Sequence, residues 1–199
     1  MFRSLFVASS ITLIAVGCSI EETTPVDAET TDVGQPTMDA DASFTVTSEN
    51  TKVSFVGTKK SGDSKSGGFK TVNGQIGVTD ERVSSVKVVI DVESLYSEAE
   101  KLTAHLKNED FFSAKEFPEL AFSSKSIVGA DEVTIIGDLT MHGQTAEIEF
   151  PATVSVTDGN VNLKAKFKVD RTQFGMNYTG QPDDPINAEV DIEISVGGE

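Results

Sequence analysis

From residue 43 onward, apolar and polar side chains alternate with a period of two, and this pattern limits what the chain can fold into. The clearest run is 161–169, where every second residue is apolar and the residues between are Asn or Lys. Runs at 86–92, 146–152 and 190–196 have the same period. Successive side chains of a strand point to opposite faces of its sheet. Such runs therefore predict antiparallel strands with one buried face and one wet face.

Further runs fit the same pattern, and turn signals such as Ser61-Gly62-Asp63 and Asp158-Gly159-Asn160 separate them. Eight or so short strands are typical of a β-sandwich or a β-barrel. A barrel of eight strands leaves no free edge and can enclose one small ligand. We therefore predict an all-β domain over residues 43–199, built as an antiparallel eight-stranded barrel. The further runs are 44–46, 52–57, 68–78, 120–126 and 133–141.

One segment, from Tyr96 to Phe112, breaks the period of two. Leu102 and Leu106 stand four residues apart there, among mostly polar neighbours. Apolar residues at that spacing lie on one face of a helix. The sequence therefore predicts one short amphipathic helix, after which Pro118 marks the return to a strand.

The N-terminal residues have a different character. Arg3 precedes a mostly apolar run, Leu5 to Val16, which is too short for a membrane span of about 20 residues. Residues 1–17 have the form of a signal peptide. Ala15-Val16-Gly17-Cys18 resembles the bacterial lipobox, whose cysteine thiol receives a diacylglyceryl group. Cys18 is the only cysteine, so we predict a lipoprotein attached to the membrane there. Ordinary cleavage nearby would instead leave a free thiol.

Residues 18–42 read as a tether between this attachment point and the barrel. They contain seven acidic residues and no Lys or Arg, and Thr and Pro fill much of the rest. Low hydrophobicity combined with charge of one sign predicts disorder. We therefore expect an acidic disordered tether that holds the domain roughly 25–30 Å from the membrane.

Charge and composition exclude several classes of function. The chain has 32 acidic and 16 basic residues, a formal net charge of −16, which argues against a nucleic-acid binder. One cysteine and two histidines exclude an intramolecular disulfide and a Cys₂His₂ zinc site. Hydrolytic triads need a base beside a nucleophile, and the sequence has no glycine-rich phosphate loop. We predict a protein that is not an enzyme and that uses no cofactor and no metal.

Four ordered blocks resemble the YceI-like, polyisoprenoid-binding proteins. The longest is 105–124, HLKNEDFFSAKEFPELAFSS, which has the His-Leu, Asp-Phe-Phe and aromatic-Pro order of that family. Residues 67–76, 137–145 and 169–178 look like three further blocks of the family. The resemblance covers about 44–196. It implies a barrel similar to lipocalins, with a long apolar tunnel that accepts an isoprenoid chain. It also implies a periplasmic or secreted protein, in agreement with the export signal.

Phenylalanine suits such a tunnel because its ring buries a large apolar area and has no polar atom to satisfy. Each of these rings could equally be an ordinary core residue. The expected lining residues are Phe55, Phe69, Phe122, Phe167 and Phe174, with Leu102, Leu106, Phe111 and Phe112 as a lid.

Three polar residues each have two interpretations. His142 precedes a glycine at the expected barrel rim, where it could donate to a ligand head group or bond a backbone carbonyl. Arg171 could meet a pyrophosphate or quinone oxygen with its fork of donors, or have a structural role with Asp170. His105 could contact ligand, although it more readily orients the helix against the barrel.

The sequence thus predicts a cell-envelope lipoprotein, periplasm-facing, that binds an isoprenoid lipid of the quinone or polyprenyl phosphate type for storage or transport. Ser19 takes the place of the Asp associated with inner-membrane retention in some bacteria, which favours the outer membrane. A homodimer is a further possibility, known in the general family. The alternative function is that of a ligand-free barrel that docks another envelope protein, and a packed interior would favour it.

Overall fold

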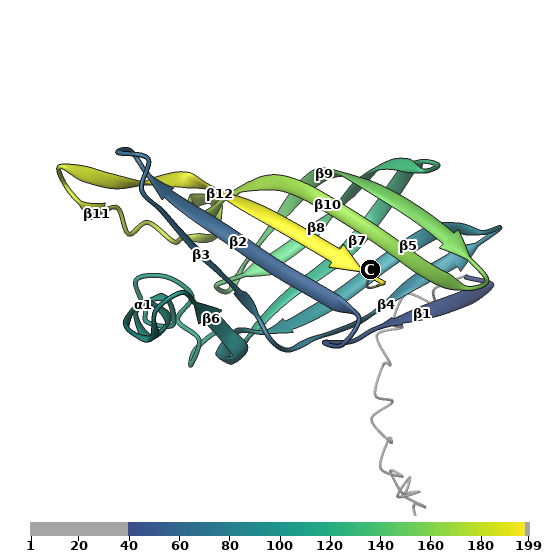
Figure 1. Ribbon diagram of the computed structural model, residues 1–199, viewed down its shortest axis with the longest axis horizontal. Helices are drawn as coiled ribbons and strands as arrows, with labels where there is room; N and C mark the ends of the chain where they lie inside the picture. The colour runs from purple at the N-terminus through teal and green to yellow at the C-terminus, as the bar shows by residue number, and fades with distance from the viewer. Residues whose placement is uncertain (1–39, 198–199) are drawn as a thin grey trace, which may run out of the picture. The chain divides into compact units, whose positions relative to one another are not determined.

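The computed structural model describes residues 40–197, which form an all-β domain with one helix (Figure 1). The predicted signal peptide, Cys18 and nearly all of the predicted tether lie outside these residues. The strands are β1 (Ala42–Val46), β2 (Thr51–Lys59), β3 (Ser64–Phe69), β4 (Val72–Thr79), β5 (Arg82–Asp91), β6 (Leu95–Ser97), β7 (Glu119–Gly129), β8 (Glu132–Met141), β9 (Gln144–Thr157), β10 (Asn160–Asp170), β11 (Gly180–Gln181) and β12 (Asp184–Val196). The helix is α1 (Glu100–Leu106), and two 3₁₀ turns are η1 (Val92–Ser94) and η2 (Arg171–Phe174).

The strands form one curled antiparallel sheet with more strands than the predicted eight. Eleven of them follow one another in the order β1-β4-β5-β7-β8-β9-β10-β12-β2-β3-β6, and β11 pairs only with β12. The run 68–78 is two strands rather than one, because the chain leaves β3 at Phe69 and starts β4 at Val72. β6 and β11 have only three and two residues, which is too short for any alternation to be visible in the sequence.

The predicted closure of the sheet into an edgeless barrel is also wrong. In the described part of the chain, the end strands β1 and β6 do not pair with each other. The chain itself bridges the two ends of the strand order, because Lys70 and Thr71 connect β3 directly to β4. Two backbone hydrogen bonds hold this connection in place. Asp91 N donates to the carbonyl of Thr71 (3.1 Å), and Lys70 N donates to that of Ser94 (3.3 Å).

The period of two places side chains as the sequence predicts. In β10, the apolar residues Val161, Leu163, Ala165 and Val169 are buried inside the curl. The polar residues between them are exposed, and Lys166 Nζ lies 3.1 Å from Glu193 Oε1 of the neighbouring β12. Burying one such apolar side chain stabilises the fold by roughly 1.5–3 kcal/mol. The alternation therefore determines which face of each strand points into the core.

The predicted helix is confirmed as α1, seven residues long. Its apolar face is narrow, since only Leu106 is buried and Leu102 is half-buried. The hydroxyl of Thr103 accepts a hydrogen bond from Ser97 N (2.9 Å), which ties the helix to β6. Figure 1 shows α1 and β11 at the same end of the sheet. In residues 40–197, no helix has the length and apolar content to cross a membrane.

Candidate binding cavity

The curled sheet encloses a cavity of about 450 Å³. This volume lies in the range of about 300–1,000 Å³ that is typical of small-molecule sites. The interior is therefore not fully packed, and a packed interior was the observation that would have favoured a ligand-free barrel. Most of the lining is apolar and comes from alternate positions of the strands. Examples are Val53, Ile76, Val86, Val88, Ile90, Leu120, Ile135, Leu139, Ile148, Leu163, Val190 and Ile192.

Two groups of phenylalanine rings line this cavity. Phe122, Phe150 and Phe167 form one, with centroids 5.6 Å and 4.2 Å apart, and the second pair is stacked at 12°. Aromatic pairs of this kind contribute about 0.5–1.5 kcal/mol beyond their buried area. Gly137 makes room for this group, because a Cβ there would lie 2.7 Å from the Phe122 ring. Because Gly137 of β8 has no side chain, the Phe122 ring of β7 can occupy the space beside it.

Phe55 and Phe69 form the second group together with Phe112, which comes from the segment after α1. The Phe112 ring lies 6.4 Å from Phe55 and 5.8 Å from Phe69, the latter in an edge-to-face arrangement. Leu102, Leu106 and Phe111 also line the cavity. The four residues that sequence analysis assigned to a lid therefore contact the same space as the strand residues, from a segment outside the main sheet.

Backbone bonds fix the lid segment in this position. Phe112 N donates to the carbonyl of Leu106 (3.1 Å), and Ser113 N donates to that of Asn108 (2.9 Å). Ahead of the helix, Glu98 accepts from Lys65 Nζ at 2.5 Å across to β3. This bond to Lys65 is the main reason that the pKa of the exposed Glu98 carboxyl is lowered. The lid is thus hydrogen-bonded internally and linked to the sheet by an ion pair at the surface.

A polar group in the cavity wall lies beside the lid. His105 packs edge-to-face on Phe111 (5.2 Å) and on Tyr178 (5.3 Å), and Phe111 lies 5.2 Å from Tyr178. All three line the cavity. His105 does orient the helix, as one interpretation expected, but it also faces the cavity. Sequence analysis did not single out Tyr178, Lys59, Lys65 or Gln181, which line the cavity too.

Arg171 is the one buried cation of residues 40–197, with 5% of its surface exposed, and it lines the cavity. Its Nε donates to the carbonyl of Asn187 (3.2 Å), and its Nη1 donates to that of Met176. Burial lowers the pKa of Arg171, and the charge of Asp170 opposes that shift. The guanidinium stays protonated in proteins. The cavity wall therefore carries a positive charge.

The expected structural pairing of Asp170 with Arg171 is not found. The Asp170 carboxylate instead accepts from the backbone N (2.9 Å) and the hydroxyl (2.6 Å) of Thr172, and so caps η2. These hydrogen bonds lower the pKa of the Asp170 carboxyl. Within the described residues, Arg171 has no carboxylate at ion-pair distance. Its hydrogen-bond partners are thus carbonyl oxygens, and the Asp170 carboxylate acts on its charge only from beyond ion-pair distance.

Two of the expected binding residues do not line the cavity. His142 Nδ1 lies 3.0 Å from the carbonyl oxygen of Phe174, and its ring packs on Phe117 (4.9 Å). His142 and Gly143 both have positive φ, as a tight hairpin turn requires, and in this turn the imidazole does not reach the cavity. Phe174 is 0% exposed. Its place in η2, rather than in a strand, buries it in the core.

The described residues offer little for catalysis. Neither His105 nor His142 makes a hydrogen bond or ion pair with a carboxylate in residues 40–197. The same part of the chain holds no group of three side chains that could bind a metal ion. What the arrangement can do is enclose an apolar molecule and offer donors to one end of it.

Comparisons with known proteins agree with the four blocks in the sequence. The YceI-like domain matches residues 44–197. A UPF0312 protein of Vibrio parahaemolyticus is 32% identical over 144 residues, which cover 70% of this chain and 71% of the relative.

Solved structures share the fold at low identity. BcnA of Burkholderia cenocepacia superposes with a TM-score of 0.64 at 22% identity, over 73% of this chain and 94% of that one. A polyisoprenoid binding domain from Saccharophagus degradans gives a TM-score of 0.63 at 14% identity, over 78% and 96% of the two chains. On the domain match and the Vibrio relative, the chain belongs to the YceI-like family.

Proposed function

We propose that this protein binds an isoprenoid lipid in the cavity, for storage or transport in the cell envelope. The observation that carries the proposal is the apolar cavity of about 450 Å³ that the sheet and the lid residues enclose. The fold it shares with a polyisoprenoid binding domain supports the same ligand class. The protein acts by binding rather than by catalysis and uses no cofactor.

The prenyl tail keeps the lipid in the cavity when the protein is in water, and the head group determines which lipid is bound. Burying a CH₂ group from water is worth about 0.8 kcal/mol, so each five-carbon unit gains roughly 3–4 kcal/mol. A bilayer offers the tail the same gain, so transfer from the membrane to a phenylalanine-lined cavity is nearly neutral. Discrimination between lipids must then come from polar contacts in the wall.

Arg171 and the His105–Tyr178 pair are the groups placed for such contacts. Met176, whose carbonyl accepts from Arg171, is two residues from Tyr178. A guanidinium, a phenol and an imidazole in the wall of one cavity favour a head group that carries acceptor oxygens. A quinone and a polyprenyl phosphate both meet that requirement.

Native mass spectrometry of the full chain, purified in mild detergent, tests this function. We expect one bound prenyl lipid per chain, or uptake of one ubiquinone or one polyprenyl phosphate added to the empty protein. Recovery of only empty protein, together with no uptake of either lipid, would contradict the proposal.

We further propose that the protein is anchored to the envelope through a lipid on Cys18, after removal of residues 1–17. Two or more acyl chains anchor a protein stably where a single chain does not. Mass spectrometry of the mature N-terminus should find acyl groups on Cys18, and Cys18→Ser should release the protein from the membrane fraction. An unmodified Cys18 in the mature chain would refute the anchor and leave the cavity proposal intact.

A further inference from the structure

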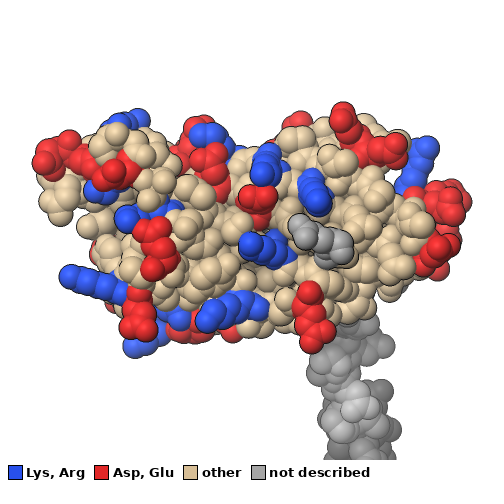
Figure 2. Space-filling view, in the orientation of Figure 1, with Lys and Arg blue, Asp and Glu red and all other residues tan. Residues whose placement is uncertain are grey.

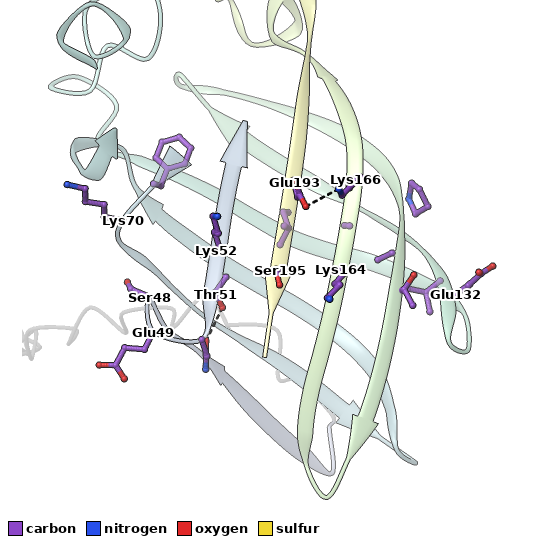
Figure 3. Close-up of a pocket in the computed structure, with 18 of the residues that line it drawn as sticks. Ser48, Glu49, Thr51, Lys52, Lys70, Glu132, Lys164, Lys166, Glu193 and Ser195 are labelled. Atoms are coloured by element: carbon purple, nitrogen blue, oxygen red, sulfur yellow. Dashed lines mark hydrogen bonds and ion pairs between the residues drawn. The ribbon is translucent and has the colours of Figure 1, made fainter. Parts of the chain in front are cut away.

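The outer face of the sheet carries an open groove of about 1270 Å³. It crosses β8, β9, β10, β12 and β2 and reaches the link after β3. Figure 3 shows that Lys52, Lys164 and Lys166 stand on this face, and Lys70 lies at one side of it. In Figure 2, basic and acidic side chains are interspersed over the face that holds β2 and β12. The groove and the cavity lie on opposite sides of the same strands, and Thr51, Phe69 and Ile194 border both.

Next to the groove, lysines of β10 pair with carboxylates of β12. Lys168 lies 3.6 Å from both Glu189 and Asp191, and Lys166 lies 3.1 Å from Glu193. Residues on one face of a strand recur every two positions. The next lysine on this face of β10, Lys164, is therefore opposite Ser195 of β12. A serine hydroxyl replaces the expected carboxylate, and the ladder of ion pairs ends there.

A row of unpaired lysines begins at this point. Ser195 lies opposite Lys164 on one side and opposite Lys52 on the other. The pairing of β2 with β3 ends at Val53 and Phe69. In an antiparallel pair the next two residues are Lys52 and Lys70, which therefore lie side by side. Figure 3 shows Lys70, Lys52, Ser195 and Lys164 in this order across the strands. Strands are about 4.8 Å apart, so the row spans about 14 Å.

The row has no carboxylate partner among residues 40–197. Lys52 and Lys164 make no ion pair there, and the Lys70 ammonium lies 5.9 Å above the ring of Tyr96. Glu132 ends the row but is two strands from Lys164, with Thr153 between them. Residues 43–199 hold 25 acidic and 15 basic residues. Glu49 and Glu193 also line the groove, and Glu193 is paired with Lys166. A domain with such a surplus of acids nevertheless leaves three lysines of this groove without an ion pair among residues 40–197.

Like charges on one face of a sheet repel each other, most directly at the neighbouring Lys52 and Lys70, and at low salt also at Lys164 two strands away. An anion between the ammonium groups would remove that repulsion, and binding to the folded state stabilises it. Lysine binds phosphate as a point charge, and a hydroxyl adds one directed hydrogen bond. We propose that Lys52, Lys70 and Lys164, with the hydroxyl of Ser195, form a binding site for a polyvalent phosphate. This site is independent of the lipid cavity.

Isothermal titration of the full chain with tripolyphosphate at low ionic strength tests the site. We expect saturable binding at one site, and at least a tenfold weaker affinity in Lys52→Gln/Lys164→Gln. Lys168→Gln is the matched control, because it removes a lysine of the same strand face that already has two carboxylate partners. An equal loss of affinity in the control and the double variant would overturn the proposal.

Thermal unfolding without phosphate gives a second readout. Lys164→Gln should raise the melting temperature at low salt, since it removes repulsion, and the rise should vanish at high salt, where charges are screened. Lys168→Gln should not raise the melting temperature. An unchanged or lowered value for Lys164→Gln at low salt would count against the repulsive row.

Vesicle binding distinguishes a lipid head group from a soluble phosphate as the source. The full chain with Cys18→Ser excludes any contribution of a lipid anchor. Sedimentation with phosphatidate vesicles but not with phosphatidylcholine vesicles, lost in Lys52→Gln/Lys164→Gln, would support the site with a lipid phosphate as its ligand. Tripolyphosphate binding without vesicle binding would support it with a soluble ligand. Absence of both would overturn it.

Discussion

Two regions of the interior are built from the same alternating strands but are filled differently. In the packed region, Val46, Val72, Val161 and Phe174 are at most 1% exposed and do not line the cavity. In the cavity region, Phe55, Phe112, Phe122 and Phe167 point into the same curl and yet are only half-buried. An inward direction therefore does not by itself mean a packed side chain.

The difference teaches what alternation can and cannot specify. Strand periodicity selects the inner face in both regions. Packing then depends on which residues meet across the curl. Where small β-branched side chains meet, as around Val161, the space closes. Where rings stack on the wall, as Phe150 does on Phe167, they leave a central space that a ligand can fill.

The packed region should show the largest effect of truncation. Phe174→Ala is expected to lower the free energy of unfolding by about 3–5 kcal/mol, because it opens a new cavity around a fully buried ring. Urea unfolding followed by circular dichroism measures this. A loss below about 1 kcal/mol would mean that the two regions do not differ in packing.

The same substitution in the cavity region should cost less stability. Phe167→Ala enlarges an existing space and loses one stacked contact with Phe150, so we expect about 1–2 kcal/mol from the lost contact and area. Unfolding under the conditions used for Phe174→Ala makes the two values comparable. A loss as large as that of Phe174→Ala would show that the Phe167 ring is packed rather than lining.

Arg171→Lys sharpens the comparison at the polar end of the cavity. Lysine keeps the charge but not the fork that reaches the carbonyls of Asn187 and Met176. Affinity for a polyprenyl phosphate should fall about tenfold, the equivalent of one charged hydrogen bond. Affinity for the matching prenyl alcohol should hardly change. Equal losses for both lipids, measured by uptake, would assign Arg171 a purely structural role.

The smallest expected effect concerns pH at the cavity rim. Hydrogen bonds from Ser61 N and from Lys59 lower the pKa of the partly exposed Asp184 carboxyl. A carboxyl whose pKa is lowered on folding stabilises the folded state at any pH above its pKa in the unfolded chain, about 3.9. This stabilisation is lost as the pH falls through the pKa of the folded state. Asp184→Asn should therefore lower the melting temperature slightly at pH 7 and not at pH 2.

Asp183→Asn is the matched control for that comparison, since Asp183 makes none of these bonds in the described residues. If both variants have the same melting temperature at pH 7, the Asp184 bonds contribute nothing to stability.

Most strands and their inner faces could be predicted, because burial imposes the period of two wherever a strand is long. The separation of β3 from β4 was missed, although the apolar positions change phase between Phe69 and Val72, because a shift of one residue can also mark a bulge within one strand. The open edges could not be predicted. Whether end strands pair depends on how far the sheet curls, and no local residue pattern encodes that.

Nine of the eleven expected ligand residues line the cavity, and the family resemblance rather than periodicity selected them. Phe174 and His142 fall outside because a 3₁₀ turn and a hairpin turn reverse the direction that a strand would give them. Tyr178 was missed because it lies in irregular chain after η2, and Gln181 because its strand, β11, is only two residues long, so spacing carries no signal at either position.

One substitution tests the central claim that an apolar ligand occupies the cavity. Gly57 lines the cavity, and a Cβ there would have no atom within 4 Å, so Gly57→Phe should fill the space without a clash. Val56→Phe adds the same ring next to it in β2, at a position that does not line the cavity. By native mass spectrometry, we expect lipid uptake by wild type and Val56→Phe and none by folded Gly57→Phe. Equal uptake by all three would contradict the account.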